Sequence, residues 1–136
     1  MTPLSKLMCG ITLLTVPTIQ YGGYFLLTIL SGRSKLQLTD FQKSMFRAGH
    51  AHAGVLVILS LIAQLFIDNI QGGATIEWLL RIGFPLAAIL VSGGFFASAS
   101  GRDVNSPNKS IVILYLGALV LAASLIILGV LLVKSK

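Results

Sequence analysis

The positions of the charged residues constrain the fold of this chain more than any other feature. Lys, Arg, Asp and Glu leave four uncharged stretches of at least 20 residues: 7–32, 48–67, 82–101 and 110–133. A helix needs about 20 apolar residues to cross the roughly 30 Å hydrocarbon layer of a bilayer. We therefore predict an all-α membrane protein, a four-transmembrane-helix bundle forming one domain over residues 1–136, with spans near 8–30, 46–67, 80–100 and 111–133.

Composition supports a membrane location. Hydrophobic residues make up 55% of the 136 residues and charged residues only 10%, whereas soluble chains carry about 25% charged residues. Transmembrane strands would alternate in character, but residues 111–133 are apolar on every face. The single cysteine, Cys9, excludes an internal disulfide and a multi-cysteine metal framework.

The cations predict an orientation. With four spans, both termini and the second loop share one membrane face, which carries the cations Lys6, Arg81, Lys134 and Lys136. The opposite face carries the cations Arg33, Lys35, Lys43, Arg47, Arg102 and Lys109. Because positive loops stay inside, we expect a multi-pass protein of a cell membrane, the bacterial inner membrane, with the first loop cytoplasmic.

Local motifs refine the helix limits. Thr39 and Gln42 have the spacing of a capping box, which predicts that the second helix begins near Asp40. Tyr21-Gly22-Gly23-Tyr24-Phe25 is echoed by Ser92-Gly93-Gly94-Phe95-Phe96, and Pro17 and Pro85 precede these segments. A duplicated helical hairpin would produce this repetition, and chance similarity is the alternative.

Both histidines of the chain, His50 and His52, lie in the second predicted span. Ionisable groups within a span are costly, so their default interpretation is functional. Residues two apart on a helix point about 200° away from each other. His50 and His52 therefore cannot ligate one ion from a single straight helix.

Three interpretations of this pair stay open. A histidine can line a path for protons or a solute, because its pKa lies near neutrality. It can ligate haem b or a transition metal, and a bis-histidine site would then need a homodimer or a partner chain. Both can also be structural, forming hydrogen bonds between helices.

Two resemblances accompany these residues. The segment Gly49-His50-Ala51-His52-Ala53-Gly54 resembles the helix of haem-copper oxidase subunit I that ligates haems on opposite faces. The first two predicted helices also resemble short, uncharacterised bacterial four-helix integral membrane proteins, through Tyr21-Gly-Gly-Tyr-Phe, Thr39-Asp-Phe-Gln and Phe46-Arg-Ala-Gly-His-Ala-His-Ala-Gly-Val-Leu. The first resemblance implies haem ligation or an oxidase accessory subunit, and the second brings no activity.

Other polar residues fall within the spans: Thr15, Thr18, Gln20, Tyr21, Ser60, Gln64, Ser92, Ser98 and Ser124. Pro17 cannot donate a hydrogen bond to Leu13, so the first helix is predicted to be distorted near mid-membrane. Transporter sites form in such segments, and tight helix packing is the alternative explanation.

A set of small residues recurs at near-helical spacing in the third span and predicts a helix or subunit interface: Gly83, Ala87, Gly94, Ser98 and Gly101. No carboxylate lies inside a span, which argues against acid-driven proton antiport and hard-cation sites. The chain also lacks a phosphate-binding glycine loop. We expect the basic loops to meet anionic lipid headgroups, and we expect no nucleic-acid partner.

These observations predict a non-enzymatic membrane protein that conducts or transports a small solute or protons. The expected path is lined by His50, His52, Thr18, Gln20, Tyr21 and Gln64. Because four helices enclose a narrow interior, we expect a homo-oligomer or a larger membrane complex. A haem- or metal-binding redox protein that uses His50 and His52, and a structural subunit of a membrane complex, are the alternatives.

Overall fold

The computed structural model describes residues 1–135. It contains four helices, α1 (Pro3–Leu30), α2 (Asp40–Ile67), α3 (Ala74–Ser98) and α4 (Ile111–Lys134). All four are long and apolar enough to cross a membrane. The predicted all-α four-helix membrane fold is confirmed, and the chain is a small multi-pass membrane protein.

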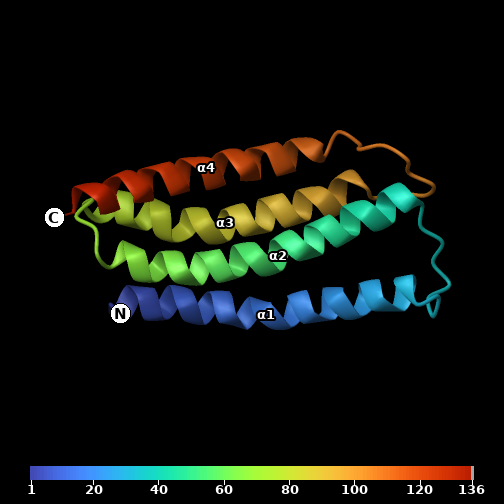
Figure 1. Ribbon diagram of the computed structural model, residues 1–136, viewed down its shortest axis with the longest axis horizontal. Helices are drawn as coiled ribbons and strands as arrows, with labels where there is room; N and C mark the ends of the chain where they lie inside the picture. The colour runs from blue at the N-terminus through green and yellow to red at the C-terminus, as the bar shows by residue number, and fades with distance from the viewer. Residues whose placement is uncertain (136) are drawn as a thin grey trace.

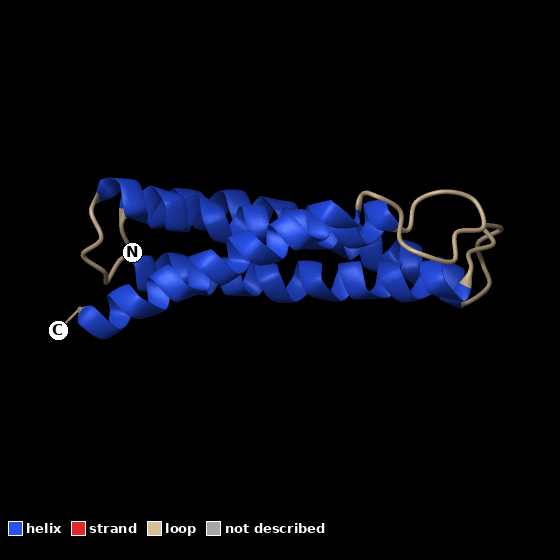
Figure 2. Cartoon of the chain, turned by 90° about the horizontal axis from the view of Figure 1, so that it is seen from above, coloured by secondary structure: helices blue, strands red, loops and turns tan. Residues whose placement is uncertain are grey.

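The helices lie side by side in chain order, with α1 at one edge and α4 at the other (Figure 1). Each helix packs mainly on its neighbours in sequence, and α1 and α4 do not touch within the described part of the chain. The start of α1, the end of α4 and the 68–73 connection lie at one end of the molecule, here called the terminal end (Figure 1). The 31–39 and 99–110 connections lie at the other, here called the loop end (Figures 1 and 2).

The predicted capping box at the start of α2 is confirmed. The Thr39 hydroxyl accepts from the Gln42 backbone N–H, and the Gln42 side chain accepts from the Thr39 backbone N–H. The same Gln42 amide donates to the carbonyls of Ala99 and Gly101, each at 3.0 Å, and the Thr39 hydroxyl donates to the Val104 carbonyl. Carbonyls at the end of a helix lack partners in that helix, so Gln42 joins the start of α2 to the end of α3.

Glycines bring α3 and α4 into close contact. A Cβ atom placed on Gly94 would lie 2.4 Å from the backbone nitrogen of Leu114, and one on Gly117 would lie 2.7 Å from that of Val91. Only residues without a side chain allow two helix backbones to approach so closely. The larger apolar core cluster lies toward the terminal end, where Ile67, Phe84 and Leu128 join α2, α3 and α4.

The first helix packs differently from the other three. Its buried residues are Ser5, Thr12, Leu26 and Ile29, so half of them are polar. Large apolar residues of α1, among them Leu14, are exposed on the molecule and in a bilayer would face lipid. The helix that forms the edge of the molecule thus buries few side chains, polar and apolar in equal number.

The structure changes the role of one cation. The sequence predicts Arg81 as a surface charge of the terminal end, but it lies at the end of the second turn of α3 with only 2% of its surface exposed. Lys6 and Lys134 also lie at this end, and Lys136 lies outside the described residues. The six cations expected at the opposite face all lie at the loop end or in the first two turns of α2.

Candidate functional site along the first helix

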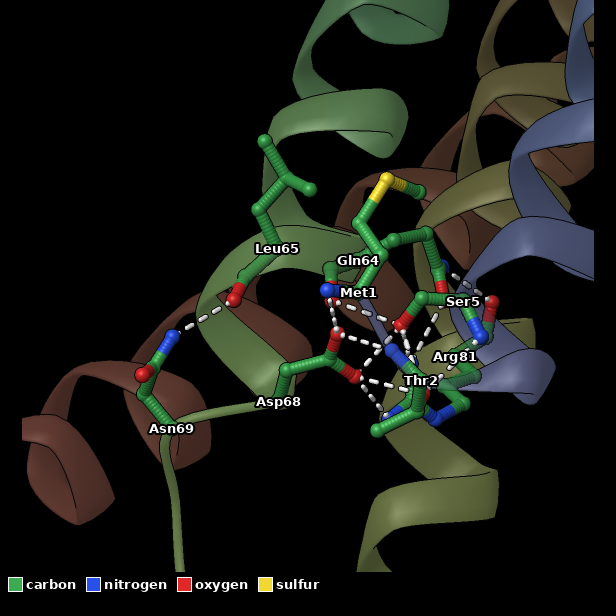
Figure 3. Close-up of polar contacts among 8 residues, drawn as sticks. All are labelled: Met1, Thr2, Ser5, Gln64, Leu65, Asp68, Asn69 and Arg81. Atoms are coloured by element: carbon green, nitrogen blue, oxygen red, sulfur yellow. Dashed lines mark hydrogen bonds and ion pairs between the residues drawn. The ribbon is translucent and has the colours of Figure 1, made fainter.

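A buried polar cluster joins three helices at the terminal end (Figure 3). Arg81 of α3 donates from Nη2 to Asp68 Oδ1 at 2.9 Å, and Asp68 caps the end of α2. Arg81 Nη1 donates to the Ser5 hydroxyl of α1 at 2.6 Å and to Gln64 Oε1 of α2 at 3.2 Å. A buried guanidinium needs such partners because an unpaired charge away from water is costly.

Gln64 also replaces a backbone hydrogen bond that Pro85 removes from α3. Pro85 has no backbone N–H, so the carbonyl four residues earlier, that of Arg81, loses its helical partner. The Gln64 Nε2 donates to this carbonyl at 3.1 Å. Gln64 is fully buried, and its two ends bind the backbone and the side chain of the same arginine.

Asp68 is held in its ionised form by this cluster. Burial by itself raises the pKa of Asp68, but hydrogen bonds from the Ser5 hydroxyl, the Thr2 backbone N–H and the Arg81 guanidinium outweigh it. The pKa of this carboxyl therefore lies well below its usual range. The network is an ion pair reinforced by hydrogen bonds from Ser5 and Thr2, and it ties the start of α1 to the α2–α3 hairpin.

A groove lies between α1, α2 and α3, here called the α1 groove, with a volume of about 240 Å³. The first helix contributes Thr12, Thr15 and Thr18, among other residues. The remaining lining residues come from all three helices: Ile11, Ile19, Ala53, Val57, Pro85, Ala88, Ile89 and Ser92. No residue that lines the groove carries a charge.

The hydroxyl groups of the groove are of two kinds. Thr12, Thr15 and Thr18 each donate to a carbonyl of α1 three or four residues earlier, at 2.6 to 2.8 Å. Ser92 is only 8% exposed, and its Oγ has no hydrogen-bond partner. Buried hydroxyls are almost always paired, so Ser92 stands apart from the threonines.

His50 lies beyond the groove, toward the loop end. A Cβ atom placed on Gly23 would lie 3.1 Å from His50 Nε2, and one on Gly22 would lie 3.6 Å from Nδ1. The imidazole is half-buried and lies directly on the backbone of α1. A side chain at Gly23 would press on this ring, so Gly23 is the residue that lets α1 lie so close to His50.

His52 lies on a different side of α2. Its Nδ1 is 2.8 Å from the Ala48 carbonyl, and its ring lies against that of Phe95, with centroids 4.9 Å apart. The side chain is exposed on the molecule. The two histidines thus contact different helices, in keeping with the 200° between them. Within residues 1–135, no three His, Cys, Asp or Glu side chains are grouped closely enough to hold a metal ion.

The structure brings only some of the predicted path residues to one surface. His50, Thr18 and Gln64 lie where α1 meets α2 and α3, here called the α1 interface. Gln20 and Tyr21 are exposed on α1, with Tyr21 72% exposed, and His52 faces away. His50 and Gln64 are 14 residues apart on α2, which is about 21 Å along a helix.

Two of the small residues of the third span, Gly83 and Gly94, lie against α4. Gly83, Ala87, Gly94 and Ser98 are buried in α3, and a Cβ on Gly83 would lie 2.4 Å from Ser124 Oγ. Gly101 lies beyond α3 in the loop, with a positive φ of 129°.

The cluster around Arg81 is the part of the site that sequence reasoning misses. Asp68 and Arg81 flank two successive uncharged stretches at the same membrane face and have opposite charges. That pairing is the signal that could have revealed the ion pair. Ser5 carries no comparable signal, because its role depends on how α1 is placed.

Comparison with protein-family models, with curated proteins and with solved structures finds no match for this chain. The residues of the α1 interface therefore provide the basis for a functional proposal.

Proposed function

We propose that this membrane protein carries a small neutral solute across the bilayer along the α1 interface. The observation that supports this most is the α1 groove, which lies midway along the helices and contains hydroxyl groups but no charge. Ionisable groups occur only beyond the groove, with the Arg81 cluster toward the terminal end and His50 toward the loop end. The substrate sites of secondary transporters also lie near the bilayer midplane.

The chemistry of the groove favours a neutral solute over protons. A relay of protons through the middle of the interface would need titratable side chains there, and the groove offers three threonines and a serine. Protons are the other cargo predicted from the sequence, so proton entry is measured beside solute entry in the experiment below.

The packing of α1 supports a role for this helix in access to the groove. It packs on α2 and only slightly on α3. Near one end its Ser5 accepts a hydrogen bond from Arg81, and near the other end its Gly23 lies against His50. Segments with few buried apolar contacts open most readily. We propose that small movements of α1 admit and release the solute.

Vesicle experiments test this proposal. Purified protein in vesicles would be assayed for uptake of glycerol, 1,2-propanediol and 1,2-butanediol by stopped-flow swelling, and for proton entry with an internal pH dye. We expect at least one diol to enter several-fold faster than in empty vesicles, and proton entry to stay unchanged.

Matched variants locate the path. Ala53→Leu narrows the α1 groove, whereas Ala51→Leu adds the same bulk on the exposed side of the same helix. The first should abolish the added flux and the second should retain it. Solute and proton rates equal to those of empty vesicles would overturn the proposal.

Haem or metal ligation is a second candidate, and one observation at His52 favours it. A carbonyl can only accept, so the Nδ1 that faces Ala48 carries the proton and leaves Nε2 free to act as a ligand. Because His50 faces α1, a bis-histidine site would take His52 from two copies. A visible absorption spectrum of the purified protein decides: a Soret band lost in His52→Ala would favour this candidate over transport.

A further inference from the structure

The α1 groove combines an apolar lining with one free hydroxyl. Its α2 and α3 sides are formed largely by alanine, valine, isoleucine and proline. The three threonine hydroxyls each donate a hydrogen bond to a carbonyl of their own helix. Such a surface suits a molecule whose body is mostly apolar, because an ion or a sugar would lose its hydration without replacement.

Ser92 supplies the groove hydroxyl that has no hydrogen-bond partner at all. Serines in apolar helices usually bond to a carbonyl of the preceding turn, as Ser60 does with Leu56 at 2.8 Å and Ser98 with Phe95 at 3.1 Å. The Ser92 Oγ is buried and makes no such bond. A buried hydroxyl without a partner is costly, and a ligand group in the groove would supply the partner.

The volume limits the size of that ligand. The groove measures about 240 Å³, whereas an apolar cavity of about 150 Å³ binds benzene. By that scale the groove holds about ten non-hydrogen atoms. Ile89 and Ile11, on its rim, are largely exposed, so the groove is accessible from the side that faces lipid.

We infer that the α1 groove binds a small uncharged molecule with an apolar body and one hydroxyl or N–H group, which pairs with Ser92 Oγ. The identification of this molecule as the carried solute rests on the proposed function, whereas its binding does not. An acyl chain of a lipid would fill the apolar part of the groove but would leave Ser92 unpaired.

A matched pair of probes tests this inference. 1-Naphthol and naphthalene share their apolar rings and differ by one hydroxyl. Binding of each would be measured by equilibrium dialysis against the protein in lipid nanodiscs, with empty nanodiscs as the blank. We expect saturable binding of about one naphthol per chain and weaker binding of naphthalene.

Variants assign the contacts. Ser92→Ala should weaken naphthol binding about five- to tenfold, the value of one hydrogen bond, and leave naphthalene unchanged, while Ser92→Thr keeps the hydroxyl and the preference for naphthol. Ala53→Leu should weaken both probes at least tenfold, and Ala51→Leu should affect neither. Circular dichroism melting of each variant would show that the fold is retained.

The inference would be overturned by the following results. Binding that does not saturate, or that Ala53→Leu leaves unchanged, would mean that the probes dissolve in lipid or that an acyl chain holds the groove. An equal affinity for the two probes would remove Ser92 as the recognition group. If naphthol binds as expected but no diol flux is seen, the transport proposal fails and this inference stands. If diol flux is seen but naphthol does not bind, this inference fails and the transport proposal stands.

Discussion

Arg81 and Asp68 form an ion pair of 2.9 Å in which the arginine is 2% exposed and the aspartate side chain 12% exposed. Removal of one member of a buried pair leaves the other uncompensated, at a cost of about 3–5 kcal/mol. We therefore expect Arg81→Met to lower the free energy of unfolding in detergent by about this amount.

The control for that variant is Arg47→Met, which removes an exposed arginine of α2. A surface change of this kind should alter the free energy of unfolding by no more than about 0.5 kcal/mol. Chemical denaturation followed by circular dichroism measures both. Similar losses for the two variants would show that the buried pair has no special role.

The ion pair also makes stability depend on pH. The pKa of Asp68 is lowered in the folded chain, whereas an unfolded aspartate titrates near 3.9, that is at about pH 4. The stabilisation is therefore complete above about pH 5 and is lost as the pH falls below about 4 toward the folded-state pKa. Melting temperatures between pH 6 and pH 2.5 should fall more steeply in the wild type than in Asp68→Asn, which cannot titrate at this position. Parallel pH profiles would contradict the assignment.

Gln64 and Pro85 should be energetically coupled. In the wild-type background, Gln64→Leu removes the hydrogen bonds of Gln64 to the Arg81 carbonyl and guanidinium. This should lower the free energy of unfolding by about 1–3 kcal/mol. In a Pro85→Ala background, the new backbone N–H of residue 85 can bind the Arg81 carbonyl, so the same change should cost less. A double-mutant cycle measured by denaturation should give a coupling free energy of at least about 0.5 kcal/mol. Additive losses would count against the hydrogen bond from Gln64 to the Arg81 carbonyl as a replacement for the one that Pro85 removes.

Two adjacent glycines of α3 should respond in opposite ways to the same substitution. Gly94→Ala would place a methyl group 2.4 Å from the Leu114 backbone, and overpacking of this kind costs about 1–3 kcal/mol. Gly93→Ala meets no atom within 4 Å and should be neutral or stabilising by up to about 1 kcal/mol, because alanine favours the helix. Thermal melts of the two variants provide the comparison, and equal shifts would argue against close α3–α4 packing.

The fold could be predicted from the sequence because its signals are local. The absence of charge over residues 82–101 or 110–133 identifies a span without any knowledge of its neighbours. The capping box at Thr39 is equally local, since both of its hydrogen bonds join residues three apart. Helical geometry likewise predicts that His50 and His52 point in different directions.

The site could be predicted only in part, because its contacts depend on which helices become neighbours. A proline leaves the carbonyl four residues earlier without its helical donor, and this can be read from the sequence at both Pro17 and Pro85. That Gln64 of α2 supplies the missing donor at Pro85 becomes evident only from the structure. Gln20 and Tyr21 have suitable chemistry for a path, yet the rotation of α1 exposes them. The Ser92 hydroxyl becomes notable only because no carbonyl accepts from it.

The cluster around Arg81 has a consequence for how the chain enters the membrane. All three of its side-chain partners, Ser5, Gln64 and Asp68, precede it in the sequence and are therefore synthesised before it. An arginine without partners costs several kcal/mol or more within a bilayer. If the helices insert in the order of translation, the acceptors on α1 and α2 are already in the membrane when the guanidinium of α3 enters. Arg81 can then pair at once with the two preceding helices, which stabilises the inserted third helix.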